Sequence, residues 1–155
     1  MSPSLQAEIR QRKPFASLEQ EASLSLSRTA ALLEHAAAEA LKPHGLTPTQ
    51  YNALRILRGA EPDGLCRNEV RDRLIARVPD ATRLLERLEE MELVVRAREG
   101  DDRRFVRARI TRAGLDLLQV LDPVVEQLHR RQLGHLGERK LRALVDLLAE
   151  ARDHR

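Results

Sequence analysis

The strongest constraint on the fold is the segment RAREGDDRRFVRARIT, residues 96–111, because its apolar and charged residues alternate with period two. This period is typical of β-strands, and EGDD in the middle favours a turn, so the sequence predicts a β-hairpin. The alternation predicts an apolar face opposite an arginine face: Val95, Ala97, Val106, Ala108 and Ile110 against Arg96, Arg98, Arg107 and Arg109. Like charges directly across a strand pair are destabilising. The number of arginines in this hairpin therefore indicates a role beyond folding.

Two short helical patterns directly precede the hairpin, at about residues 67–75 and 79–91. A short ARV linker separates them, and Pro79 suits the first turn of the second helix. Two short helices joined by a tight turn form a helix-turn-helix unit. A helix-turn-helix followed by a two-stranded hairpin is the winged-helix arrangement, and we place it at residues 45–111.

Longer amphipathic helices flank this unit. Apolar residues recur every three or four positions over residues 17–41, where KPHG ends the pattern, and again after Thr111 and from Glu138 to about Asp153. Pro123 interrupts the middle pattern, so we expect a kink there or a restart capped by Asp122. Residues 1–14 are expected to form a mobile arm or a short extra helix.

The helix that begins the central unit has a strong start signal. Thr47 is placed to cap it, Pro48 occupies the first helical position, and Gln50 completes a capping box. Leu46 and Tyr51 are spaced to form a hydrophobic staple across that cap. The predicted fold class is therefore mainly α with a small β-hairpin wing, in a single domain covering residues 1–155.

The terminal helices, within residues 17–43 and 112–153, must bury their apolar faces. The most economical arrangement is a homodimer in which these helices intertwine, and a monomeric helical bundle is the alternative. Cys66 is the lone cysteine, so no intramolecular disulfide forms, and the chain carries no signal peptide or membrane-spanning run. These features predict a soluble cytoplasmic protein with no membrane partner.

The second helix of the helix-turn-helix is the candidate DNA reader, because its N-terminal part enters the major groove in such units. Thr82 suits a thymine methyl or a phosphate, and Arg83 and Arg87 suit guanine or phosphate. Asp80 can accept from cytosine, but capping the helix is the favoured role. Arg77, in the preceding turn, is a further candidate contact. The alternative for the arginines is local pairing with Asp80, Glu86 or Glu90.

Several motifs resemble those of the MarR family of bacterial and archaeal regulators. The most specific is Asp102-x-Arg104, followed after a five-residue strand by Ile110-Thr111, which resembles the wing signature of that family. The helix before the helix-turn-helix in that family is similar to GLTPTQYNALRIL, and its recognition helix is similar to TRLLERLEEMELVVR. The entry into its dimerisation helix is similar to ITRAGLDLL. The resemblance extends over roughly residues 17–151.

The resemblance implies a homodimer that binds a palindromic operator in double-stranded DNA and represses transcription until a small-molecule effector or oxidation releases it. It places Arg104 in the minor groove, beside Arg103 at the wing tip, with Asp102 holding an arginine by a salt bridge. It also implies an effector pocket between the dimerisation helices and the winged helix. Glu92 departs from the family, which commonly has glycine there to form a left-handed helix cap.

Other functions have weaker support. The histidines are scattered, and no HExxH motif, metal-spaced Cys/His cluster or glycine-rich phosphate loop occurs, so we expect neither an enzyme nor a cofactor. His35 or His129 can line an effector pocket, although a solvated role is favoured. Cys66 can act as an oxidation sensor, although a small buried role is favoured. A winged helix that binds proteins instead of DNA is the remaining alternative.

Overall fold

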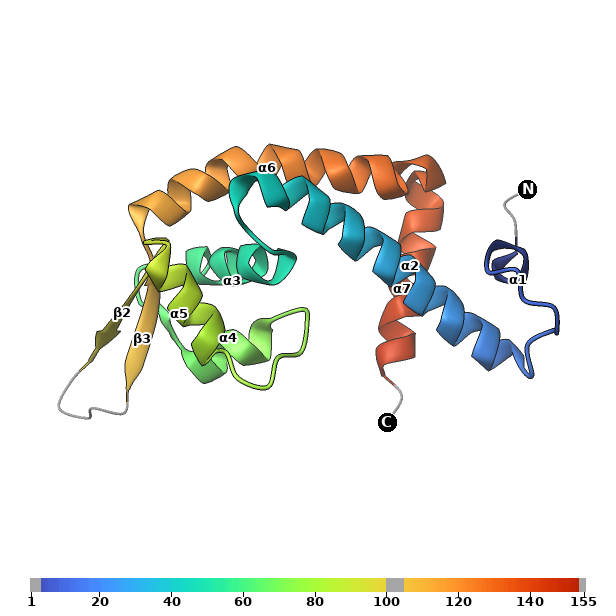
Figure 1. The fold of residues 1–155 in the computed structure, drawn as a ribbon, viewed down its shortest axis with the longest axis horizontal. Coiled ribbons are helices and arrows are strands. Elements are labelled where there is room, and N and C mark those ends of the chain that lie inside the picture. The colour runs from blue at the N-terminus through green and yellow to red at the C-terminus, as the bar shows by residue number, and fades with distance from the viewer. Residues whose placement is uncertain (1–3, 100–104, 154–155) are drawn as a thin grey trace.

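The computed structural model describes residues 4–99 and 105–153 (Figure 1). A short helix, α1 (Leu5–Glu8), precedes the long helix α2 (Leu18–Leu41). Ser17 Oγ caps α2 by accepting the N–H of Gln20 at 3.1 Å. The helix tightens into a 3₁₀ turn, η1 (Lys42–His44), and Gly45 ends it with a left-handed φ of 73°. Both the short extra helix and the stop at KPHG follow the sequence-based predictions.

Helix α3 (Pro48–Arg58) begins with the predicted capping box. Gln50 N donates to Thr47 Oγ1 at 3.2 Å, and Gln50 Oε1 accepts from Thr47 N at 3.0 Å. Leu46 and Tyr51, the predicted staple pair, are both buried in the same hydrophobic core. Leu54 and Leu57 are completely buried on the same helix, so α3 is the centre of the winged-helix core.

The helix-turn-helix consists of α4 (Arg67–Arg73) and α5 (Thr82–Glu90), and both helices are shorter than predicted. Leu74 is already extended, and Ile75 N donates to Asn52 Oδ1 at 2.9 Å, which ties the turn to α3 instead of continuing α4. Helix α5 begins at Thr82, so the placement of Pro79 in its first turn was wrong. Met91 follows the last residue of α5 and is 37 % exposed.

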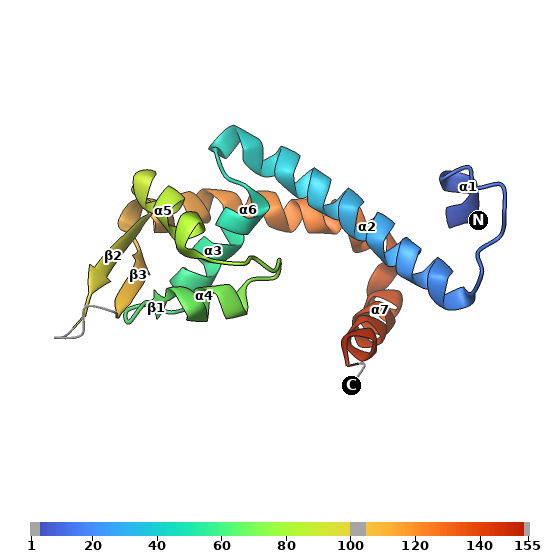
Figure 2. The same cartoon turned by 60° about the horizontal axis from the view of Figure 1, so that its bottom comes forward.

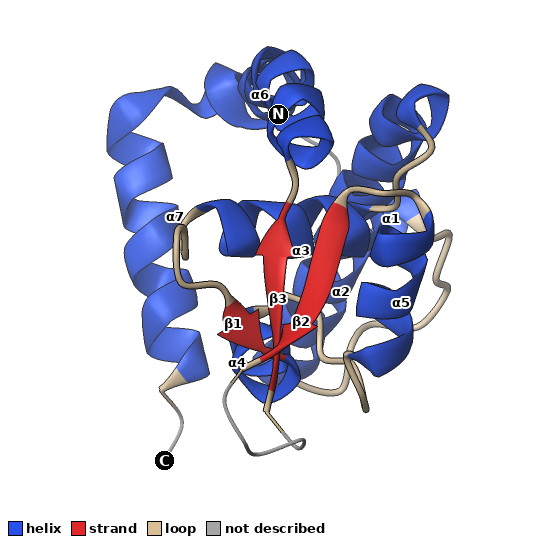
Figure 3. Ribbon diagram, turned by 90° about the vertical axis from the view of Figure 1, so that its left-hand side faces the viewer, coloured by secondary structure: helices blue, strands red, loops and turns tan. Residues whose placement is uncertain are grey.

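The sheet has three antiparallel strands in the order β1 (Leu65–Cys66), β3 (Val106–Ile110), β2 (Val94–Arg98) (Figure 3). The two-residue strand β1 was not predicted from the sequence. The register pairs Arg96 with Ala108 and Ala97 with Arg107. Residues directly opposite in a pair share a face. The prediction of a single arginine face was therefore wrong: Arg96 and Arg98 lie on one face, and Arg107 and Arg109 on the other.

Helix α6 (Arg112–Leu133) is capped by Thr111 Oγ1, which accepts the N–H of Gly114 at 3.1 Å. It continues through Pro123 without a restart, so the predicted capping role of Asp122 was wrong. Asp122 instead receives a bidentate hydrogen bond from Arg58 on α3, at 2.7 and 3.2 Å, and a 3.3 Å bond from the Tyr51 hydroxyl. This cluster joins the winged helix to α6.

A 3₁₀ turn, η2 (Gly134–Leu136), leads into the last helix, α7 (Gly137–Arg152), which agrees with the helix predicted from Glu138 to about Asp153. Figures 1 and 2 show an elongated arrangement in which the wing lies at one end and α7 lies at the other with the first half of α2. The core is concentrated around α3, α5, the sheet and the first half of α6. No residue of α7 is buried, and only Leu41 of α2 is.

Candidate nucleic-acid interface

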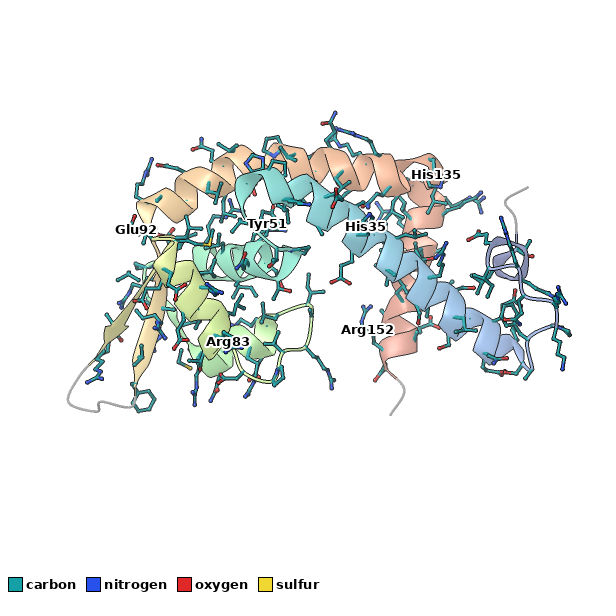
Figure 4. The ribbon with its side chains drawn as sticks, viewed as in Figure 1. His35, Tyr51, Arg83, Glu92, His135 and Arg152 are labelled. Carbon is teal, nitrogen blue, oxygen red and sulfur yellow. The ribbon has the colours of Figure 1, made fainter. Side chains whose placement is uncertain are left out.

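Helix α5 separates its core side chains from its exposed ones. Leu85 and Leu88 are buried against the sheet side of the core, whereas Arg83 and Arg87 are exposed. Arg83 and Arg87 are four residues apart and therefore share a helix face (Figure 4 labels Arg83). Arg87 Nη1 lies 3.2 Å from Glu90 Oε2, which is one of the local pairings considered from sequence. Exposed pairs of this kind contribute little energy, so Arg87 can exchange Glu90 for a phosphate at little cost.

The start of α5 is fixed by a hydrogen-bonded chain of three side chains. Arg67 Nη1 donates to Thr82 Oγ1 at 3.2 Å, and that hydroxyl donates to Asp80 Oδ1 at 2.7 Å. Asp80 Oδ1 also accepts the backbone N–H of Thr82 at 2.9 Å, and this bond lowers the pKa of Asp80. Asp80 thus satisfies the first amide of the helix, as favoured from sequence, although from just outside the helix instead of within its first turn.

The junction between α5 and the wing forms a Schellman motif. Leu93 N donates to Leu88 O at 3.0 Å, and Glu92 N donates to Glu89 O at 2.9 Å. Glu92 has a φ of 61°, so a residue with a side chain occupies the left-handed position for which glycine is usual. Thr111 Oγ1 donates to Glu92 O at 2.7 Å and holds this corner against the start of α6 (Figure 4).

The strand arginines pair with acidic groups on both faces of the sheet. On the face toward α5, Arg96 Nη2 lies 2.7 Å from Glu89 Oε2. On the other face, Glu99 bridges Arg107 and Arg109. The register therefore removes the predicted repulsion between arginines, because those of β2 and β3 no longer face one another.

The structure brings together only some of the residues predicted to contact DNA. Asp80 and Thr82 are in direct contact, Arg83 and Arg87 extend along the same helix, and Arg77 is exposed in the turn before it. The three candidates of the wing tip lie outside the described residues: Asp102, Arg103 and Arg104.

A hollow of ≈ 520 Å³ lies between the starts of α4 and α5 and the inner face of the wing. Its lining includes Thr82 and Arg96 together with Arg67 and Asn68, which were not predicted from the sequence to contribute to a site. No local sequence pattern identifies Arg67 as a site residue. Arg67 is the first residue of α4, and only the fold places it beside Thr82. Half-buried Cys66 also lines this hollow and pairs with Arg107 across β1 and β3.

A larger cavity of ≈ 750 Å³ lies between α2, α3, α6 and the turn that follows α4. It is mostly apolar, and His129 lies in its wall whereas His35 does not. Tyr51 does not line this cavity; it is buried in the core, and its hydroxyl donates to Asp122. The cavity is lined by Ala30, Leu33, Glu34, Ala37, Pro48, Thr49, Asn52, Ile75, Ala76, His129, Gln132 and Leu133.

The described part of the chain contains neither a candidate metal site nor a candidate membrane-spanning helix. Over residues 4–99 and 105–153, histidine, cysteine and carboxylate side chains form no group of three that could hold a metal ion. Within those same ranges, no helix combines the length and the apolar character needed to cross a membrane.

Comparisons with known proteins agree with this architecture. The model of the MarR family matches residues 44–104. The HTH-type transcriptional regulator FarR of Neisseria gonorrhoeae is 31% identical over 110 residues, which cover 71% of this chain and 74% of FarR. MhqR of Bacillus subtilis, also an HTH-type transcriptional regulator, is 32% identical over 82 residues, which cover 52% of this chain and only 54% of MhqR.

Solved structures extend the likeness to nearly the whole chain. A MarR transcription factor from Planctomyces limnophilus is 42% identical, with a TM-score of 0.69, covering 88% of this chain and 98% of that one. NadR in complex with 4-hydroxyphenylacetate is 26% identical, with a TM-score of 0.69, covering 92% of this chain and all (100%) of that one. MepR of S. aureus in complex with DNA shares the fold at 21% identity, with a TM-score of 0.76, covering 83% and 94%.

Proposed function

Because this chain belongs to the MarR family of transcription regulators, we propose that it binds a palindromic operator as a homodimer and represses transcription until a small molecule releases it. The observation that carries the DNA-binding part is the surface built by α5 and the wing. Exposed Arg83 and Arg87 extend from a helix start that Arg67, Thr82 and Asp80 hold in place. This presents cationic, bidentate donors where a helix-turn-helix enters the major groove.

The homodimer is proposed because two helices extend beyond the core, and apolar side chains on both remain exposed to solvent. Leu18 is 77 % exposed on α2, and Val145 and Leu147 are each 62 % exposed on α7. Helix α7 and the first half of α2 lie at the end of the molecule away from the wing (Figures 1 and 2). Exposed apolar surface of this extent marks an interface, and a symmetric pairing of the same helices is the simplest one that closes.

A small-molecule effector is proposed for the ≈ 750 Å³ cavity, whose size falls in the range of ligand sites. Its wall includes Ile75 and Ala76, in the turn that leads from α4 to α5. Asn52 holds that turn by accepting from Ile75 N at 2.9 Å. A ligand that displaces the turn would therefore move α5. NadR, which resembles this chain in fold, has been solved with 4-hydroxyphenylacetate.

The DNA-binding proposal is tested with the DNA upstream of the protein's own gene, at several salt concentrations. Arg83→Ala and Arg104→Ala are each expected to weaken binding by about 1–3 kcal/mol, and the affinity is expected to fall linearly with salt on logarithmic axes. Arg130→Ala is the matched control, because Arg130 is exposed on α6 and pairs with Glu126. Equal affinities for all four chains would refute the assignment of this surface.

A further inference from the structure

The outer face of the wing carries an ion cluster that the proposed DNA contacts do not include. Glu99 directly follows β2, and its N–H donates to Phe105 O at 3.2 Å. Its carboxylate lies 2.9 Å from Arg107 Nε through one oxygen and contacts Arg109 Nη2 through the other. We call Glu99, Arg107 and Arg109 the Glu99 clamp.

Both arginines are tied further to the loop before β1. Arg107 Nη1 donates to Gly64 O at 3.1 Å, and Arg109 Nε donates to Pro62 O at 3.0 Å. Each guanidinium is therefore held by one carboxylate oxygen and one backbone carbonyl. The three side chains remain 35–42% exposed, so solvent and a polyanion can reach them. The clamp is an accessible cationic surface whose charge is half neutralised from within.

We propose that the outer face of the wing is a DNA-phosphate-binding surface, and that Glu99 limits its strength by occupying Arg107 and Arg109. This inference rests on the proposed DNA-binding function. Two arginines and one glutamate leave the Glu99 clamp itself with a single net positive charge. Phosphate contacts supply affinity for any DNA sequence, whereas base contacts supply specificity. By restraining two cations, Glu99 lowers the affinity for non-operator DNA and so raises the ratio of specific to non-specific binding.

The experiment uses a probe that needs no knowledge of the operator. Full-length protein is titrated into a fluorescein-labelled duplex of random sequence, about 25 base pairs long, at a series of salt concentrations. Glu99→Gln keeps the shape of the side chain and removes its charge. We expect the slope of log affinity against log salt to steepen by about 1–2, because each additional phosphate contact contributes about 0.9 to that slope. At the lowest salt we expect binding to tighten by about tenfold.

Two comparisons separate the clamp from simpler effects. Glu126→Gln removes the same charge from an exposed pair with Arg130 on α6, and it is expected to leave the slope unchanged. Arg107→Gln/Arg109→Gln removes the cations that Glu99 is proposed to restrain. In that background Glu99→Gln is expected to have no further effect. If it tightens binding there as much as in the wild-type background, Glu99 merely repels DNA and the clamp is refuted.

The outcomes also distinguish the clamp from the function on which it rests. Binding by the wild-type chain with an unchanged slope in Glu99→Gln overturns the clamp and leaves DNA binding intact. Failure of both chains to bind the random duplex and the upstream DNA overturns both. Melting midpoints check that each variant is folded, and the single variants Arg107→Gln and Arg109→Gln replace the double variant if it unfolds. Either single variant is then expected to reduce the Glu99→Gln effect by about half.

Discussion

Glu92 shows how one residue can be held in an unfavourable conformation by its neighbours. Its φ of 61° costs a residue with a side chain about 1–2 kcal/mol relative to the right-handed region. Hydrogen bonds around the corner impose that conformation: Leu93 N to Leu88 O, and Thr111 Oγ1 to Glu92 O. Glutamate thus replaces the glycine that is common at this position, and the helix still ends in the usual left-handed cap.

Replacing Glu92 with glycine is therefore expected to stabilise the protein. Glycine relieves the left-handed conformation but adds freedom to the unfolded chain, so we expect the free energy of unfolding to rise by about 0.5–1 kcal/mol. Glu86→Gly is the matched control, because Glu86 lies inside α5, where glycine destabilises by about 0.5–1 kcal/mol. Urea unfolding measures both changes, and a loss of stability in both variants would contradict the account of this corner.

Thr82 is constrained in a way that narrows what it can offer to DNA. Its hydroxyl accepts from Arg67 and donates its hydrogen to Asp80, so it has no hydrogen to donate to a phosphate, and the methyl group remains available for an apolar contact with a base. Thr82→Ser keeps the hydroxyl bonds and removes the methyl. We expect operator binding to weaken by about 0.8 kcal/mol, roughly fourfold, with an unchanged melting midpoint. On DNA in which uracil replaces thymine, the two chains should bind equally well, and a persisting difference would exclude a thymine-methyl contact.

Helices α3 and α6 are joined by the Asp122 cluster, which links the winged helix to the long helix. The hydrogen bonds from Arg58 lower the pKa of Asp122, and burial raises the pKa of Tyr51. A lowered carboxyl pKa stabilises the fold above the ordinary aspartate pKa of about 3.9, and this contribution is lost as pH falls through the lower folded-state value. The link is therefore intact at neutral pH.

Asp122→Asn is expected to reduce the free energy of unfolding by about 1 kcal/mol at neutral pH, since the pair is partly exposed. The difference from the wild-type chain should shrink as pH falls below about 4. Tyr51→Phe serves as the comparison, because it removes only the 3.3 Å hydroxyl bond. Denaturant unfolding at several pH values provides the measurement. A difference that grows toward acid pH would show that the sign of this linkage is wrong.

The elements themselves were largely predictable, since caps and periodicity are local signals. Thr47, Gln50, Thr111 and the stop at KPHG each act within a few residues, and the helices begin or end near them. The pairing of the hairpin strands was not predictable in the same way. Alternation assigns faces within one strand, but the turn sets the phase between strands, and a shift of one residue exchanges the faces.

The remaining features that the sequence did not predict depend on contacts between residues far apart along the chain. Asp122 beside Pro123 looks like a helix cap in sequence, and only the fold reveals its bond to Arg58, which lies far away along the chain. Strand β1 is short enough that its pairing with β3 leaves no periodic pattern. Arg67 gains its contact with Thr82 only when α4 and α5 meet. The sequence thus predicted the second helix of the helix-turn-helix and its cap by Asp80, but not the contact of Arg67 with Thr82.

At the scale of the whole molecule, the exposed apolar side chains of α2 and α7 favour a dimer over the single-chain bundle. Val145→Asp places a charge in this surface. We expect the wild-type chain to run as a dimer and the variant to dissociate at least about tenfold more readily, measured by light scattering after size-exclusion chromatography. Val95→Asp is the control, because Val95 is 48 % exposed on the wing at the opposite end of the molecule. Equal dimerisation in both variants would exclude α7 from the interface.

We propose that two winged helices, related by two-fold symmetry, read DNA together. Selection of bound sequences from a random duplex library, followed by sequencing, tests it most directly. A two-fold symmetric dimer is expected to select a palindromic motif whose half-sites lie about 10 base pairs apart, centre to centre, on one face of the DNA helix. Arg83→Ala is also expected to relax the base preference at one position in each half-site. An asymmetric motif, or no enrichment over the starting library, would contradict the claim.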